Sequence, residues 1–375
     1  MRYLFFFVHP SKFHVFRRTI NILAEHGHSV DILITSKDVL EDLVKAEGWN
    51  YTNIFPEGRK MKRVPPYISS AINFFRTIFR LFRYTREKKY DLFVTDDLLV
   101  YIGKWKKVPS IVFNDDDLNI VKQYALVLSQ ATWILSPDIT HVGKYTHKKI
   151  GFPGYKELAY LHPNVFNPDI KVVEQFNPDL SPYFIIRLVS LKAYHDVGVK
   201  GLSDHQVLQL INTLEKHGKV FISSERPLPP QFEKYRLSIK PENIAHVLYF
   251  AELFIGDSQT MTSEAAVLGT PAFRCNDFVG RISVMDEKEE KYGLSFNFPP
   301  AKFEEMMIKI DELLKMPILK KEFEERKNRM LHDKIDLSAF LLWLFENYFK
   351  IDFSKPLPFD NFKAIEKNTL EEYTN

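Results

Sequence analysis

Short apolar runs alternate with longer amphipathic segments along the chain, and this alternation restricts the possible folds more than any other feature. In the first half, the runs lack the polar–apolar alternation of a half-exposed strand, and segments with helical spacing separate them. The runs are residues 3–8, 29–35, 91–95, 109–113 and 132–136. Strands buried on both faces and joined by helices are typical of parallel sheets, so the sequence predicts an α/β fold.

A stretch rich in proline and glycine interrupts this rhythm. Residues 151–182 contain seven such residues, a density that a long helix or a central strand does not tolerate. A chain of 375 residues with 45% hydrophobic content is also too long for one typical domain. We therefore predict a first domain at 1–150, a linker at 151–182, a second domain at 183–350 and an extended tail at 351–375. Three amphipathic helices, at 300–314, 319–331 and 337–349, are expected to close the second domain.

Cysteine content and hydropathy bear on the compartment. Cys275 is the single cysteine, which excludes a disulfide framework and fits a reducing cytosol. The apolar run 4–8 is too short for the core of a signal peptide and is interpreted as a strand. No run approaches the roughly 18 to 20 apolar residues that a spanning helix needs. We expect a cytoplasmic protein, peripheral on the inner membrane face at most.

Basic residues are concentrated in the segment 59–89, which holds ten of them and one acid, Glu87. On a helix, Arg76, Arg80 and Arg83 would share one face, and Phe74, Ile78 and Leu81 would point to the other. Such a helix suits an anionic membrane surface, although aromatic residues packed on a sheet with arginines in water would give the same pattern. Nucleic-acid binding is not expected, because the glycines and aromatic platforms of RNA-binding modules are not evident.

The segment 253–273 carries the strongest indication of function. It is interpreted as a strand at 253–255, a turn at 256–260, a helix at 262–268 and a further strand. Ser258 and Thr260 would add hydroxyl donors to the free amides and positive dipole end of the helix, a combination that favours an anion. Glu264 could accept two hydrogen bonds from a diol. A diphosphate beside a ribose meets both demands, whereas an ordinary strand-to-helix connection with a solvated Glu264 is the structural alternative.

Residues 257–271 fit the pattern D-S-x-T/S-M-x-x-E-A-x-x-L-G-T-P. This pattern resembles the donor-nucleotide segment of GT-B glycosyltransferases and of the UDP-GlcNAc 2-epimerases that share their fold. A wider match, over most of residues 1–345, is similar to a prokaryotic family found near polysaccharide-synthesis genes and without an assigned activity. That match rests on His26-Gly27-His28, Tyr155-Lys156-Glu157, Ser224-Glu225 with Pro227, and Tyr292-Gly293. The resemblance implies two Rossmann-like parallel-sheet domains facing a central cleft, with the last helix folding back over the first domain.

Further donor-side candidates follow from the rule that ligands of such sheets bind beyond the carboxyl ends of the strands. Arg187 ends one strand and could bind phosphate oxygens, or form an ion pair instead. Ser224 and Glu225 follow the next strand and could meet base or sugar, or serve a turn. The GT-B resemblance implies that His246 lies near the nucleobase, although a lone helical histidine is more often structural. A polar cluster follows the strand ending at Arg187 and is a further candidate: Lys192, Tyr194, His195 and Asp196.

The first domain is expected to supply the base that deprotonates an acceptor hydroxyl. His14 is interpreted as the start of the first helix, where the dipole would keep its ring neutral. Asp115, Asp116 and Asp117 follow an apolar strand, and three adjacent carboxylates need a ligand, a cation or a capping role. Asp97 is a weaker candidate of the same kind. Asp115 and Asp117 satisfy Asp-x-Asp by spacing, but no metal site or cofactor is predicted, since the histidines are scattered and the GT-B resemblance implies metal-independent donor binding.

These observations predict a glycosyltransferase that moves a sugar from a nucleotide-diphosphate sugar to a glycan or lipid-linked acceptor in surface polysaccharide synthesis. Two alternatives remain at this point. A UDP-sugar 2-epimerase would use the same donor site, although Gln259 and Thr260 stand where epimerases usually carry paired glycines. A non-catalytic nucleotide-sugar-binding protein would bind the donor without turnover.

Overall fold

A computed structural model describes residues 1–375 except 38, 60, 62–64, 191–200, 278 and 364–375. The chain forms two compact units. Unit 1 comprises Met1–Tyr160 and Lys334–Asn375, and unit 2 comprises Leu161–Asp333. Among the described residues, no helix combines the length and the apolar character needed to cross a bilayer.

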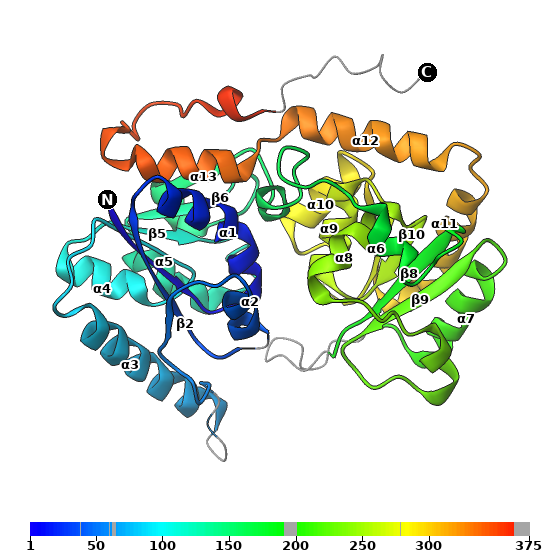
Figure 1. The fold of residues 1–375 in the computed structure, drawn as a ribbon, viewed down its shortest axis with the longest axis horizontal. Coiled ribbons are helices and arrows are strands. Elements are labelled where there is room, and N and C mark those ends of the chain that lie inside the picture. The colour runs from blue at the N-terminus through cyan, green and yellow to red at the C-terminus, as the bar shows by residue number, and fades with distance from the viewer. Residues whose placement is uncertain (38, 60, 62–64, 191–200, 278, 364–375) are drawn as a thin grey trace. The chain divides into compact units, whose positions relative to one another are not determined.

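Unit 1 is built on a seven-stranded parallel sheet with the order β3-β2-β1-β4-β5-β6-β7 (Figure 1). Its strands are β1 Arg2–Phe7, β2 Ser29–Ile34, β3 Tyr51–Asn53, β4 Leu92–Thr95, β5 Ser110–Phe113, β6 Trp133–Pro137 and β7 Lys149–Phe152. Strands β1, β4 and β5 lie in the middle of the sheet and are almost entirely buried, as the continuous apolar runs predict.

Helices cover both faces of this sheet. They are α1 Pro10–Glu25, α2 Leu40–Ala46, α3 Pro66–Thr85, α4 Leu99–Lys106, α5 Ala125–Gln130 and α13 Leu337–Glu346. Side chains of α3, α4 and α5 share one core with alternate residues of the central strands. On the other face, α13 packs against α1 (Figure 1). The ring of Phe345 contacts those of Phe5 and Phe16. The predicted return of the last helix to the first domain is therefore confirmed.

Unit 2 holds a five-stranded parallel sheet with the order β12-β11-β10-β8-β9. Its strands are β8 Tyr183–Leu188, β9 Lys219–Ser224, β10 Leu253–Gly256, β11 Ala272–Cys275 and β12 Ser295–Phe298. Its helices are α6 Ile170–Glu174, α7 Asp204–Leu214, α8 Ile244–Phe250, α9 Gln259–Leu268, α10 Ser283–Glu290, α11 Phe303–Leu314 and α12 Leu319–Asp333. The predicted class, two parallel-sheet α/β domains, is confirmed.

Local chemistry accounts for several boundaries. Ser203 and Gln206 form a reciprocal capping box at the start of α7. Gly269 ends α9 in the left-handed conformation at φ 87°, where a side chain would be strained, and Pro271 prevents the helix from continuing. Residues 151–182, predicted as a linker, contain the end of β7 and the helix α6. Gly151 is tolerated in β7 because this is an edge strand with one neighbour, and Pro153 follows the end of the strand.

The segment after α13 packs on that helix as far as it is described. Residues 359–362 form a short 3-10 turn. The rings of Phe359 and Phe362 lie 5.1 and 5.6 Å from the ring of Phe340. These contacts attach the start of the predicted tail to unit 1.

Candidate functional site

In unit 2, α9 begins directly after β10 with a capped amino terminus. Ser258 is the N-cap, and its hydroxyl accepts a hydrogen bond from the amide of Met261 at 3.3 Å. The helix begins at Gln259, so the prediction of a start at 262 was wrong. The turn closes earlier because the Thr262 hydroxyl donates to the Ser258 carbonyl at 2.7 Å in addition to this cap. The amides of Gln259 and Thr260 precede any intrahelical acceptor, which leaves N–H donors at the positive end of the dipole.

Accessible groups of α9 are concentrated at this amino end. Met261, Thr262 and Ser263 are buried, whereas Ser258, Gln259, Thr260 and Glu264 are half-buried. Thr260 and Glu264 are four residues apart and therefore share one helix face. The structure thus brings the hydroxyl groups of Ser258 and Thr260 to the amino end of α9. The carboxylate of Glu264 lies about one turn further along the helix.

Asp257 anchors this turn and was not assigned a role from the sequence. Its side chain is 2% exposed, and Oδ1 accepts a hydrogen bond from the Val189 amide at 2.7 Å. The backbone at Gly201 passes so close that an added Cβ would lie 2.5 Å from Oδ2 of Asp257. Burial raises the pKa of Asp257 to about 6, whereas the hydrogen bond from Val189 acts to lower this pKa. The sequence signal was an aspartate immediately after a buried strand.

Arg187 and Glu225 are brought together, although as partners of each other. The Arg187 guanidinium donates to the Ser223 hydroxyl at 2.7 Å and forms an ion pair with Glu225. The ion-pair alternative considered for Arg187 is therefore present. Gly256, beside Arg187 in the sheet, cannot carry a side chain, because a Cβ would lie 2.9 Å from the Arg187 carbonyl oxygen. Ser224 serves its own turn, since its hydroxyl donates to the Arg226 carbonyl at 2.7 Å.

His246 lies on α8 and supports a neighbouring segment. Its Nδ1 accepts a hydrogen bond from the Asp169 amide at 3.0 Å, and its ring lies 4.9 Å from that of Phe166. Because Nδ1 is an acceptor, Nε2 carries the proton of the neutral ring. The four polar candidates Lys192, Tyr194, His195 and Asp196 fall outside the described residues.

In unit 1, a buried carboxylate lies between two ammonium groups beyond the carboxyl ends of β1 and β5. Asp115 binds Lys12 at 2.5 Å through Oδ1 and Lys156 at 2.7 Å through Oδ2. The Lys12 ammonium also lies 4.8 Å from the Phe113 ring centroid. Burial alone would raise the pKa of Asp115, but the two lysines hold it well below its usual range. Lys12 was missed from the sequence, where its only signal was its place in the first turn after β1.

The other acidic candidates next to Asp115 have different surroundings. Asp116 is exposed, whereas Asp117 is 3% exposed and accepts a hydrogen bond from the His141 amide at 2.7 Å. Desolvation and the charge of Asp115 raise the pKa of Asp116 even though its side chain reaches the surface. The acidic triplet therefore divides into an ion-pair centre, an accessible carboxylate and a group that holds a loop.

His14 is separated from this cluster. It lies within α1, which begins at Pro10, so the prediction that His14 starts the helix was wrong. Pro10 extends the helix at its beginning, because its fixed φ suits the first helical position. His14 and Lys12 are two residues apart and so point to different sides of α1. Burial, followed by the charge of Arg17, lowers the pKa of His14 to about 4, and its ring lies 5.3 Å from that of Tyr160.

Asp96 is a further candidate proton acceptor, which was not singled out from the sequence. It follows β4, is half-buried, and its Oδ1 accepts a hydrogen bond from the Val8 amide at 3.0 Å. Burial raises the pKa of Asp96 to about 6, opposed by the charge of Lys12. Its neighbour Asp97, the weaker candidate, forms an ion pair with Arg59 at 2.5 Å. Asp96 therefore combines access with a pKa close to neutrality.

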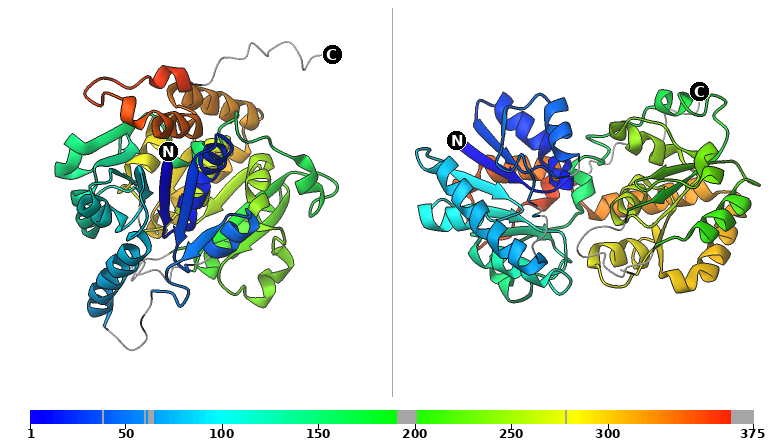
Figure 2. Two further views of the ribbon diagram at one scale, coloured as in Figure 1. Left: turned by 60° about the vertical axis from the view of Figure 1, so that its left-hand side comes forward. Right: turned by 90° about the horizontal axis from the view of Figure 1, so that it is seen from below.

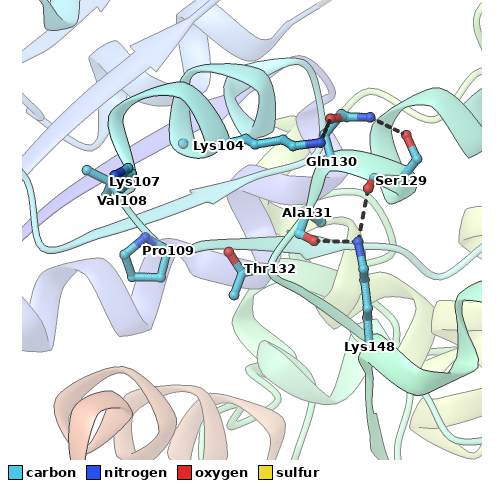
Figure 3. A pocket seen from close by; sticks show the side chains of 10 residues that line it. Lys104, Lys107, Val108, Pro109, Ser129, Gln130, Ala131, Thr132 and Lys148 are labelled. Carbon is cyan, nitrogen blue, oxygen red and sulfur yellow. Dashed lines mark hydrogen bonds between the residues drawn. The ribbon is translucent and has the colours of Figure 1, made fainter.

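A cavity of about 430 Å³ lies elsewhere in unit 1, at the amino ends of β5 and β6 (Figure 3). Lys104, Lys107 and Lys148 line it, and Lys148 donates to the carbonyl oxygens of Ser129 and Ala131. This cavity is separate from the sites of Asp96 and Asp115, because those residues follow the carboxyl ends of β4 and β5. Within the described ranges, no three His, Cys, Asp or Glu side chains are grouped so that they could hold a metal ion.

Comparison with solved structures identifies the fold. The sequence matches no protein-family profile and no curated protein. A UDP-GlcNAc 2-epimerase from Neisseria meningitidis bound to UDP-GlcNAc matches with a TM-score of 0.64 at 14% identity, over 94% of this chain and 100% of that chain.

Two further structures extend this likeness. S. aureus MnaA in complex with UDP matches with a TM-score of 0.66 at 11% identity, covering 95% of this chain and 98% of its own. Acinetobacter baumannii MurG matches with a TM-score of 0.59 at 13% identity, covering 92% and 100% respectively. The two parallel-sheet units of this chain thus share the GT-B fold of these solved structures.

Proposed function

We propose that the protein is a metal-independent glycosyltransferase that uses a nucleotide-diphosphate sugar and a glycan or lipid-linked acceptor in surface polysaccharide synthesis. The amino end of α9 carries this proposal. It presents free amides, the hydroxyls of Ser258 and Thr260 and the carboxylate of Glu264 on a fold shared with proteins bound to UDP or UDP-GlcNAc. The diphosphate binds at the helix end, and Glu264 binds the ribose hydroxyls.

In the proposed reaction, unit 1 supplies the base. The acceptor hydroxyl loses its proton as its oxygen bonds to the anomeric carbon, and the bond from that carbon to the diphosphate oxygen breaks. The helix dipole stabilises the leaving nucleoside diphosphate. Asp96 is the proposed proton acceptor, because Asp115 is committed to two lysines. Arg187, Ser224, Glu225 and His246 remain predicted donor-side groups whose present partners are protein atoms.

A 2-epimerase is the second candidate. Matching structures described as UDP-GlcNAc 2-epimerases have TM-scores from 0.58 to 0.67, a range that includes the 0.59 of MurG, so the likeness supports both candidates equally. An epimerase needs proton transfer at the sugar, and a half-buried carboxylate with a pKa near 6 suits that step as well.

Product analysis separates the candidates. The purified chain is incubated with UDP-, GDP-, CMP- and dTDP-sugars, with and without membrane glycolipids, and products are analysed by mass spectrometry and NMR. Acceptor-dependent nucleotide release supports transfer, and an isomerised sugar without acceptor supports epimerisation. Saturable binding without product supports the non-catalytic alternative. Absence of binding to every nucleotide sugar contradicts the proposed donor site.

The pH profile of any activity tests the base. If Asp96 accepts the proton, activity rises as the pH passes through about 6, and Asp96→Asn removes that limb. If His14 is the base, the acidic limb lies near pH 4 and His14→Gln removes it. A limb near 6 that persists in Asp96→Asn would refute the assignment to Asp96.

A further inference from the structure

Helix α3 has two apolar faces, of which the unit buries one. Leu81 is fully buried, and Phe74, Ile78 and Phe82 pack against the same core. A second face carries four large apolar side chains that are exposed to solvent. They are Ile68 at 38%, Ile72 at 37%, Phe75 at 72% and Phe79 at 62%. Their spacing of four, three and four residues places them in one stripe along the helix.

The neighbouring helix α4 adds an exposed aromatic side chain beside α3. Trp105 is 62% exposed, and its ring lies 4.6 Å from the ring of Phe82 on α3. We call Ile68, Ile72, Phe75, Phe79 and Trp105 the α3–α4 apolar surface. A cluster of exposed aliphatic and aromatic side chains is costly in water, unlike single exposed residues. Helix α3 runs along the outer side of unit 1 (Figures 1 and 2), where such a surface is accessible within that unit.

Basic residues continue the stripe at its carboxyl end. Arg83 and Arg86 follow Phe79 by four and seven residues, on the same side of the helix, and both are exposed. Neither forms an ion pair with any residue that the structure describes. Three further exposed lysines lie in sequence near Arg86 or Trp105: Lys89, Lys104 and Lys107.

The arginines expected to form the basic face instead have partners. Arg76 and Arg80 each bind Glu57 at 2.6 Å, and their guanidinium groups lie 5.2 and 4.2 Å from the Phe55 ring centroid. The grouping of Arg76 and Arg80 with Arg83 as one solvent-facing basic surface is therefore corrected. The sequence showed the local charge, but the pairing with Glu57 depends on the tertiary fold.

Charge decides which partner suits the α3–α4 apolar surface. In a twofold contact the same patch meets itself, so the arginines would lie against each other or against the apolar stripe. Either arrangement buries cations without acidic partners, which is costly. An anionic lipid bilayer accommodates both parts, because acyl chains receive the apolar groups and headgroups pair with the cations.

We propose that the α3–α4 apolar surface docks unit 1 on an anionic membrane, with Arg83 and Arg86 at the headgroups. This inference goes beyond the proposed reaction, since docking does not require a nucleotide sugar. Of the three arginines that the sequence grouped, the membrane contact keeps Arg83, whereas Arg76 and Arg80 pair with Glu57.

Vesicle binding tests the proposal. The full chain is sedimented with vesicles of phosphatidylcholine alone or mixed with phosphatidylglycerol, at low and high salt. Binding should require phosphatidylglycerol and weaken with salt. Phe79→Ser should reduce the partition coefficient about tenfold. Phe349→Ser is the matched control, because Phe349 is also in unit 1 and is 64% exposed, and it should bind like the wild type.

Charge reversal gives the second arm. Arg83→Glu with Arg86→Glu should weaken binding roughly 25-fold or more, at about fivefold for each lost cation. Lys216→Glu with Lys240→Glu changes the net charge equally at exposed sites of unit 2 and should have little effect.

Three outcomes would overturn the proposal. They are absence of binding to the anionic vesicles, equal losses in the control variants, and a change in oligomeric state caused by Phe79→Ser without any change in vesicle binding. The last result would indicate a second copy of the chain as the partner. Nucleotide-sugar binding, measured separately on the same variants, should be unchanged, so failure of the donor site and failure of docking are distinguishable.

Discussion

Asp115 and Asp257 are both buried aspartates that follow a parallel strand, one in each unit, yet their pKa values shift in opposite directions. Asp115 lies between Lys12 and Lys156, which lower its pKa. Asp257 has an amide donor from Val189 and no lysine or arginine ion pair among the described residues, and burial raises its pKa to about 6. The comparison shows that position at a strand end does not set the charge state; the side chains that the fold brings to it do.

The difference extends to the surroundings of each aspartate. In unit 1, charged groups mainly satisfy one another, and Asp96 remains half-buried with a pKa of about 6. In unit 2, the accessible groups beside Asp257 are the neutral donors of Ser258 and Thr260 and the carboxylate of Glu264. The first arrangement suits proton transfer and the second suits an anion with a neighbouring diol.

The largest effect is expected from removal of the unit 1 carboxylate. Asp115→Ala leaves the buried Lys12 and the half-buried Lys156 without their shared partner, so the free energy of unfolding should fall by about 3 to 5 kcal/mol. Urea denaturation followed by tryptophan fluorescence measures this loss. Asp116→Ala, at the adjacent exposed position, should change stability by no more than about 0.5 kcal/mol. Equal effects of the two substitutions would show that the buried ion pairs are unimportant.

A pH series tests the opposite behaviour of Asp257. Its pKa is raised from 3.8 to about 6, so its contribution to stability is complete below pH 3.8 and is lost as the pH rises through about 6. The Asp257→Asn variant has no carboxyl group to ionise at this position. Its stability relative to the wild type should therefore increase by about 3 kcal/mol as the pH rises from acidic to neutral. Unfolding midpoints of both proteins across this range provide the measurement. If the substitution shifts stability by the same amount at every pH, the pH dependence of the difference is unaffected. A stability difference between the two proteins that does not vary with pH would contradict the raised pKa of Asp257.

Donor binding tests the accessible carboxylate of unit 2. Glu264→Ala should weaken binding of a nucleotide-diphosphate sugar by about 1.5 to 3 kcal/mol if its charged hydrogen bonds to the ribose form. Isothermal titration calorimetry measures the affinity, and thermal unfolding of the variant shows whether the fold is retained. Glu242→Ala, an exposed acid in the same unit, serves as control. Unchanged affinity in Glu264→Ala would remove Glu264 from the donor site.

The smallest effect concerns the helix end itself. Ser258→Ala removes the hydroxyl that caps the Met261 amide, at a cost of about 1 kcal/mol of stability. Chemical denaturation should detect this loss, while Ser70→Ala at an exposed position of α3 should be close to neutral. A neutral Ser258→Ala would indicate that the cap does not stabilise the start of α9.

Much of the fold could be predicted because its signals are local. The continuous apolar runs indicated buried parallel strands, and Gly269 with Pro271 indicated the end of α9. Helix starts were less accurate at α1 and α9. There, Pro10 and the Ser258 cap extend the helices beyond their apolar periodicity.

The candidate site was predicted in part. Ser258, Thr260 and Glu264 lie within one short segment, so their shared helix end follows from sequence spacing. Lys12 and Asp115 are 103 residues apart, and their pairing depends on strand order, which no local pattern encodes.

By itself, the amino-acid sequence determined the parallel α/β class, the helix after β10 and the excess of cations around α3, because each depends on residues that are neighbours in the chain. Only the tertiary structure decided that Lys12 and Lys156 neutralise Asp115, that Arg187 pairs with Glu225, and that Glu57 binds Arg76 and Arg80. The physical reason is that charge interactions and desolvation depend on distance in space and on burial. Folding sets both quantities by bringing together segments that are remote in sequence.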